Sequence, residues 1–108
     1  MNKYTELSDF EINKRVFVAA KIEHEDTDLH SNKVFYGDGA KWIEFNPCNN
    51  PTDAMPIIIE NEIGLSPMYH SNKWTADCLD YDFISVNKNP LRAAMELFLL
   101  MKDAENEG

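Results

Sequence analysis

The residues best suited to chemistry lie between Asn46 and Asp53, where three asparagines and two prolines occur close together. Asn50 followed by Pro51 is typical of the cap and the first position of a helix. A helix start gathers unpaired backbone N–H groups, which can hold an anion or a polar ligand edge. The side chains of Asn46, Asn49 and Asn50 would add donors and acceptors suited to a nucleobase or an amide. The alternative is that these residues only cap the helix and shape the turn.

Other side chains could complete such a site. Tyr69, His70 and Trp74 follow after a short connection, and an exposed ring there would stack on a base. The alternative is core packing for Trp74 and a plain loop for the other two. Arg92 would meet a phosphate if the fold brings it near, whereas Asp53 argues against a bare phosphate. The predicted site for a small polar ligand comprises Asn46, Asn49, Asn50, Asp53, Tyr69, His70, Trp74 and Arg92.

The sequence shows no catalytic motif. Cys48 lies near a predicted helix start, which lowers a thiol pKa, and His24, His30 or His70 could serve as its base. However, no family signature surrounds the cysteine, and the acidic stretch around His24 and His30 lacks metal-ligand spacing. A glycine-rich phosphate loop is also missing. We therefore expect no catalytic residues, no metal and no cofactor.

The charge balance is unusual. Ten lysines and arginines face nineteen aspartates and glutamates, which leaves a net charge of −9. So acidic a chain is a poor candidate for non-specific nucleic-acid binding or for anionic membranes. Its acidity would attract a basic protein, including by mimicry of nucleic acid, or would only keep a small protein soluble.

Length and hydropathy predict one folded domain over residues 1–108, with 44% hydrophobic residues. No apolar run reaches the roughly 20 residues of a membrane span, and the first residues lack the apolar stretch of a secretory signal. Cys48 and Cys78 are too few for a disulfide framework, and Cys78 is predicted to lie in the core. We expect a cytoplasmic protein with reduced thiols.

Local signals predict a helix near the N-terminus. Ser8 as N-cap, with Glu11 three residues later, forms a capping box. The apolar spacing that follows predicts a helix over about 9–21. The acidic stretch 23–32 has little periodicity and is predicted as an exposed loop.

A second clear helix is predicted at the C-terminus. The dipeptide Asn89–Pro90 is a cap and first position, followed by a helix over 91–102 and a frayed tail at 103–108. This helix is apolar nearly all round, so it must be buried inside the domain or against a second subunit. Leu97 and Leu100 lie outside its main apolar stripe, and we therefore predict a homodimer.

Two hairpins are predicted between these helices. Residues 33–36 and 40–45 are short and β-branched or aromatic, and they flank the turn Gly37–Gly39. Residues 73–79 and 81–86 form the second hairpin.

A short bent helix separates the hairpins. It is predicted to follow Asn50, to contain Pro56, and to end with Gly64 in the left-handed conformation. The order of elements is thus helix, hairpin, short helix, hairpin, helix. This order predicts an α+β domain, with a small antiparallel sheet and the helices on one face.

Three segments resemble the NinX family of lambdoid-phage proteins. They are the opening LSDFEINK (7–14), the segment from FNP to DAMPII (45–58), and NPLRAAM (89–95) with the Leu- and Met-rich helix that follows. Met55 stands where the family often has an aromatic residue, and Glu96 interrupts the apolar run.

The resemblance implies a phage- or prophage-encoded protein of the host bacterial cytoplasm, with no assigned biochemical activity. By analogy, accessory phage proteins of this size often bind and disable something of the host. We therefore predict a non-enzymatic counter-defence protein that sequesters a nucleotide-like host immune signal. The alternative is an acidic inhibitor of a basic host protein.

Overall fold

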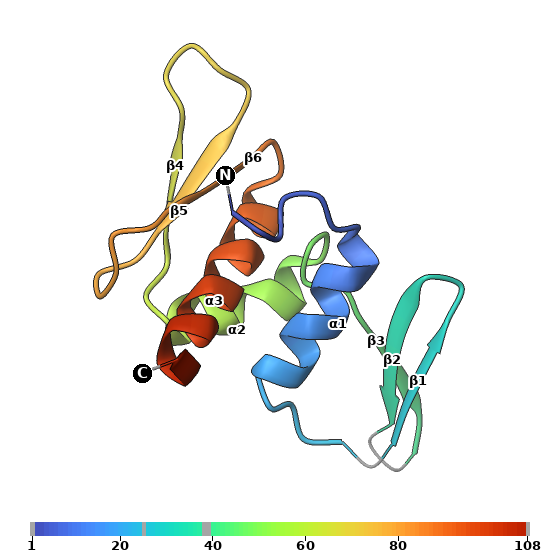
Figure 1. Ribbon diagram of the computed structural model, residues 1–108. Coiled ribbons are helices and arrows are strands. Elements are labelled where there is room, and N and C mark those ends of the chain that lie inside the picture. The colour runs from blue at the N-terminus through green and yellow to red at the C-terminus, as the bar shows by residue number, and fades with distance from the viewer. Residues whose placement is uncertain (1, 25, 38–39, 108) are drawn as a thin grey trace.

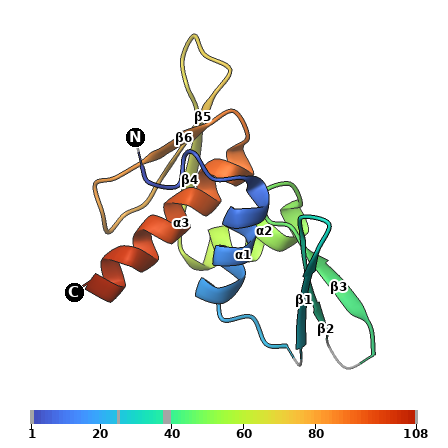
Figure 2. The same cartoon turned by 45° about the vertical axis from the view of Figure 1, so that its right-hand side comes forward.

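The computed structural model describes residues 2–24, 26–37 and 40–107, and these residues form helices and two small sheets. Figures 1 and 2 show the helices in the middle, with one sheet on either side. The predicted α+β class and order are confirmed, and each predicted hairpin belongs to its own three-stranded antiparallel sheet. The elements are α1 (Asp9–Ala19), β1 (Asp26–His30), β2 (Lys33–Gly37), β3 (Trp42–Phe45), α2 (Pro51–Glu60), β4 (Gly64–Pro67), β5 (Trp74–Asp77), β6 (Ser85–Asn87) and α3 (Pro90–Glu107).

Helix α1 begins as its sequence predicts. The Ser8 hydroxyl accepts a hydrogen bond from the Glu11 backbone N–H at 3.1 Å, which satisfies one orphan donor of the first turn. The Glu11 carboxylate pairs with Lys14 at 3.2 Å and with Arg15 at 3.8 Å. The helix ends slightly earlier than predicted, before Lys21, whose φ of 55° is left-handed.

The first sheet contains a strand that the sequence pattern did not predict. Residues 26–30, predicted as part of a loop over 23–32, form β1 and pair with β2, which pairs in turn with β3. All five β1 side chains are exposed, so the strand has no burial alternation. Main-chain hydrogen bonds to β2 hold it, together with the His30 ring, which stacks on Phe35 with centroids 4.7 Å apart. Glu25 of the predicted loop and Asp38 and Gly39 of the predicted turn lie outside the described residues.

The second sheet has shorter strands than predicted. Strand β5 pairs with β6. Because β5 ends at Asp77 and β6 begins only at Ser85, a long connection separates them. Strand β4, which was not among the predicted strands, adds a third strand beside β5. Cys78 follows β5 and packs against the core, as predicted, but it is only half-buried there.

Helix α2 begins at its predicted cap. The Asn50 side chain accepts a hydrogen bond from the Thr52 backbone N–H at 3.0 Å, and Pro51 takes the first helical position. Pro56 lies inside the helix, which nevertheless runs from Pro51 to Glu60.

The end of α2 differs from the prediction. Glu62, with φ of 52°, takes the left-handed position that Gly64 was expected to fill. Its N–H donates to the Ile59 carbonyl at 3.2 Å, and the N–H of Ile63 donates to the Ile58 carbonyl at 3.0 Å. This pair of bonds is a Schellman motif. The left-handed residue that ends α2 is therefore Glu62 instead of Gly64, and Gly64 begins β4.

Helix α3 lies at the centre of the core. The Asn89 side chain accepts the Leu91 N–H at 2.9 Å, which confirms the predicted cap. The helix continues to Glu107, so the predicted frayed tail at 103–108 is helical as far as the structure describes it. Helix α3 packs against α1, α2, β5 and β6. Its core side chains are Ala93, Ala94, Met95, Leu97, Phe98, Leu99 and Met101.

This packing removes the reason given above for a homodimer. Leu97 is fully buried within one chain, and Leu100 is half-buried against the core. The second sheet covers one side of α3, and α1 and α2 pack against its other sides. None of the described helices is long and apolar enough to cross a membrane.

Candidate functional site

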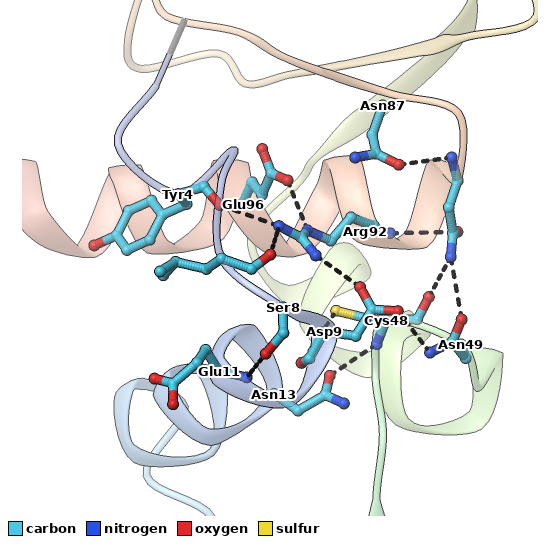
Figure 3. A network of polar contacts seen from close by, with 12 residues as sticks. Tyr4, Ser8, Asp9, Glu11, Asn13, Cys48, Asn49, Asn87, Arg92 and Glu96 are labelled. Atoms are coloured by element: carbon cyan, nitrogen blue, oxygen red, sulfur yellow. Dashed lines mark hydrogen bonds and ion pairs between the residues drawn. The ribbon is translucent and has the colours of Figure 1, made fainter. Parts of the chain in front are cut away.

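The asparagine side chains of the 46–53 segment form hydrogen bonds within the protein, although Asn49 and Asn50 are exposed. The Asn13 side chain of α1 donates to the Asn46 Oδ1 at 2.8 Å and accepts the Cys48 backbone N–H at 3.1 Å. The Asn49 side chain donates to Asp9 at the start of α1, at 3.1 Å. Figure 3 shows Asn13 and Asp9 reaching toward this segment from one side. The segment therefore fastens the β3–α2 connection to α1.

The cap of α3 joins the same network. The Asn89 side chain, whose oxygen caps α3, donates through Nδ2 to the Cys48 carbonyl at 2.6 Å and to Asn49 Oδ1 at 3.4 Å. We call Asn13, Asn46, Asn49 and Asn89 the asparagine network. It joins α1 and the cap of α3 to the β3–α2 connection, and two of its members, Asn46 and Asn49, are residues that the ligand prediction assigned to a nucleobase edge.

Arg92 is buried and fully engaged inside the protein. Its Nε donates to Glu96 at 2.7 Å, its Nη1 to Asp9 at 2.7 Å, and its Nη2 to the carbonyls of Tyr4 and Leu7 at 3.0 and 2.6 Å. Burial alone would lower the pKa of Arg92, but the hydrogen bonds to Asp9 and Glu96 raise it. As Figure 3 shows, these donors point to Glu96 of α3, to Asp9 of α1 and to the N-terminal segment.

Cys48 lies in the same region and is fully buried. Burial, with the nearby charge of Asp9, raises the pKa of its thiol to about 12, although Arg92 opposes this. The thiol is therefore protonated at neutral pH. This is the opposite of the lowered pKa that a helix start could have given a nucleophile.

Asp53 has a different environment from the asparagines. Its carboxylate accepts the Asn46 backbone N–H at 2.9 Å. Burial raises the pKa of Asp53, and the nearby Glu44 charge adds to this, while the hydrogen bond from Asn46 lowers it. Asp53 lines a cavity of about 260 Å³ between α2 and the first sheet, which we call the α2 cavity. Asn50 is the cap of α2 and does not line it.

The predicted aromatic residues lie elsewhere. Tyr69 and His70 occupy the tip of the β4–β5 hairpin, where Tyr69 is 88% exposed and the two ring centroids are 4.0 Å apart. Trp74 is half-buried at the start of β5. Figures 1 and 2 both show this hairpin pointing away from the start of α2. The structure therefore joins Asn49 to Arg92 through Asp9 and joins Asn46 to Asn49 directly, and it separates these residues from the three rings.

Metal-binding side chains do not gather in the described part of the chain, where no group of three histidine, cysteine, aspartate or glutamate residues could hold an ion. His30 pairs with Asp28 at 2.6 Å on β1, and the His24 ring bonds to the Ile22 carbonyl at 2.7 Å.

A further surface was missed by the sequence analysis. Residues 77–84, which we call the acidic loop, connect β5 to β6 and project from the helices in Figures 1 and 2. Leu79 is 82% exposed and Ile84 is 53% exposed. The acidic loop also carries exposed aspartates that make no ion pair with any described residue, namely Asp77, Asp80 and Asp82. Three aspartates alternating with apolar residues could have signalled a loop, since aspartate is disfavoured in strands.

A groove lies beside the acidic loop, between the N-terminal segment and α3. It has a volume of about 680 Å³, and we call it the apolar groove. Its lining residues are Asn2, Thr5, Lys73, Phe83, Ile84, Val86 and Leu100. Phe83 stacks on Tyr81, with ring centroids 5.0 Å apart, so the acidic loop has an ordered aromatic base.

Comparison with known proteins identifies a family for this chain. No curated protein sequence matches the chain. The family described as bacteriophage P22 NinX matches residues 3–102, a range that includes the asparagine network, Arg92 and the acidic loop. Since the match covers almost the whole chain, this protein belongs to the NinX family of bacteriophage P22.

Proposed function

We propose that this phage accessory protein is a non-enzymatic binding protein that docks on a basic protein of the host through the acidic loop. The observation that carries the proposal is the composition of that loop. Asp77, Asp80 and Asp82 are exposed without ion pairs among the described residues, and they alternate with the exposed Leu79 and Ile84.

Both parts of this surface favour a protein partner. Exposed carboxylates of one sign steer a basic partner and speed its association. Burial of an exposed leucine side chain by a partner contributes about 1.5–3 kcal/mol to the free energy of binding. The apolar groove beside the loop would accept an apolar side chain of the same partner, next to Ile84. By analogy with other accessory phage proteins, we place this binding in counter-defence.

Sequestration of a nucleotide-like immune signal has less support. Arg92 and the asparagine network already donate to acceptors inside the protein, and the aromatic rings lie at a separate hairpin tip. That function stays a prediction. Calorimetry against cyclic dinucleotides and ADP-ribose derivatives tests it, and an absence of heat together with an unchanged Tm would contradict it.

Affinity capture from host lysate tests docking by the acidic loop. We would compare the wild type with Asp77→Asn/Asp80→Asn/Asp82→Asn at about 0.1 M and about 1 M salt. A matched control, Glu6→Gln/Glu23→Gln/Glu62→Gln, removes the same number of exposed charges elsewhere.

We expect the wild type and the control variant to retain one basic host protein at low salt only. The loop variant should lose it, and the purified partner should bind the loop variant at least tenfold more weakly. Equal capture by the loop variant, or capture that survives high salt unchanged, would contradict the proposal.

A further inference from the structure

The α2 cavity combines an apolar floor with carboxylates at its edge. It lies between α2, the end of α1 and the first sheet, on the side of the helices away from the acidic loop. Its lining residues are Ala20, Ile22, Tyr36, Phe45, Thr52, Asp53, Pro56, Ile57 and Glu60.

Aromatic rings form the firmest part of this floor. Phe45 is 3% exposed, and its ring packs edge-on against Tyr36, with centroids 6.5 Å apart. Phe17 of α1 lies behind both rings, at 5.6 Å from Tyr36 and 5.5 Å from Phe45. These mutual contacts fix the rings in place, so the floor is already formed before anything binds.

The carboxylates come from one face of α2. Asp53 and Glu60 are seven residues apart, which is two helical turns, and both line the cavity. Neither forms an ion pair with a described residue, and the pKa of Asp53 is raised by burial and by Glu44. Within the described chain, therefore, no ion pair neutralises either carboxylate.

Two lysines of the described residues line a neighbouring cavity. Lys21 and Lys102 line an adjoining cavity of about 170 Å³, which shares Glu60 with the α2 cavity. Lys102 is already paired with Glu105 at 3.1 Å. Neither lysine lines the α2 cavity, and no cation acts on the Asp53 pKa.

We infer that the α2 cavity binds a guanidinium group. A guanidinium is planar, donates forked N–H groups to carboxylates, and stacks on aromatic rings. Asp53 and Glu60 would accept its hydrogen bonds, while Tyr36 and Phe45 would face its plane or its methylene stem. At about 260 Å³ the cavity is smaller than the roughly 300–1,000 Å³ of most ligand pockets, which suits one side-chain-sized group.

This inference does not rest on the proposed function, because the acidic loop lines no part of the α2 cavity. The probe is N-acetyl-L-argininamide, titrated into the isotope-labelled full chain and followed by NMR. N-acetyl-L-citrullinamide is the matched control, since it has the same shape without the charge.

We expect argininamide to shift the amide signals of α2 and β3 in a saturable way and citrullinamide to bind at least tenfold more weakly. Asp53→Asn/Glu60→Gln should abolish the shifts. Because Asp53 also holds the Asn46 N–H, Glu60→Gln alone is a second variant, expected to weaken binding about tenfold. Glu62→Gln, at the end of α2 and outside the cavity, should bind as the wild type does.

A second arm distinguishes the source of the guanidinium. Tighter binding of a short peptide with one arginine than of free argininamide points to a protein side chain, and equal binding points to a small molecule; both results support the site. Equal binding of argininamide and citrullinamide, or unchanged binding by Glu60→Gln, would overturn it. Neither result depends on capture through the acidic loop.

Discussion

Arg92 and Asp9 form an ion pair of 2.7 Å between α3 and the first turn of α1, although 83 positions separate them in the chain. Asp9 uses its other oxygen to accept the Asn49 side chain at 3.1 Å. One carboxylate at a helix start thus joins α1, the β3–α2 connection and α3. Asp9 also lies in the first turn of α1, where a carboxylate stabilises the helix through the helix dipole.

Removing the guanidinium should therefore be costly. Arg92→Ala leaves Glu96, which is fully buried, without its charged partner. We expect a loss of about 3–5 kcal/mol in the free energy of unfolding, measured by urea denaturation. The double variant Arg92→Met/Glu96→Met removes both charges and should recover most of this loss. An Arg92→Ala protein as stable as the wild type would show that the pair contributes nothing.

Tyr4 should make stability fall at high pH. Burial and the hydrogen bond to Asp103, at 2.5 Å, raise the Tyr4 pKa from 10.0 to about 12. Because the folded pKa is the higher one, this contribution is complete below pH 10 and is lost as the pH rises toward 12. Tyr4→Phe should lose stability less steeply than the wild type over this range in urea unfolding. Tyr69→Phe is the control and should follow the wild type.

Glu62 offers a stabilising substitution. Its φ of 52° is left-handed, where a side chain is strained and glycine is not. We expect Glu62→Gly to raise the free energy of unfolding by about 0.5–1 kcal/mol. Glu62→Ala removes the same carboxylate but keeps a Cβ, so it should give no such gain. Equal effects of the two variants would assign the change to charge rather than to backbone strain.

The predicted homodimer needs a revised test. Leu97 is fully buried in the core, so Leu97→Glu should unfold the chain instead of dissociating a dimer. Circular dichroism separates these outcomes, since a dissociated dimer keeps its helices. The dimer itself stays a prediction, and light scattering at tens of micromolar decides it. A mass near 12.4 kDa would contradict it.

Structural features that are specified by a few neighbouring residues could be predicted from the sequence. The caps Ser8, Asn50 and Asn89 each accept the N–H that their sequence position assigns to them. Strand β1 could not be found in this way, because its side chains are all exposed and its partner is another strand. The end of α2 was misplaced because glycine is only the preferred residue for a left-handed position, not the required one.

The candidate site was less predictable than the caps. The types of Asn46, Asn49 and Arg92 indicate hydrogen bonding, but sequence cannot say whether the partner is a ligand or Asp9. Only long-range packing decides this, since the partners come from distant segments. The α2 cavity likewise joins Asp53 to Tyr36 across two elements that no local pattern connects.

The central position of α3 has a consequence for biosynthesis. Helix α3 supplies much of the core and receives the N-terminal segment through Arg92, yet it leaves the ribosome after every other element described. Until it emerges, α1, α2 and the second sheet lack the surface against which they pack. Contacts between residues far apart in the sequence slow folding. In this protein, folding has to wait until α3 has been translated. A ribosome stalled before Pro90 would therefore carry a protease-sensitive nascent chain.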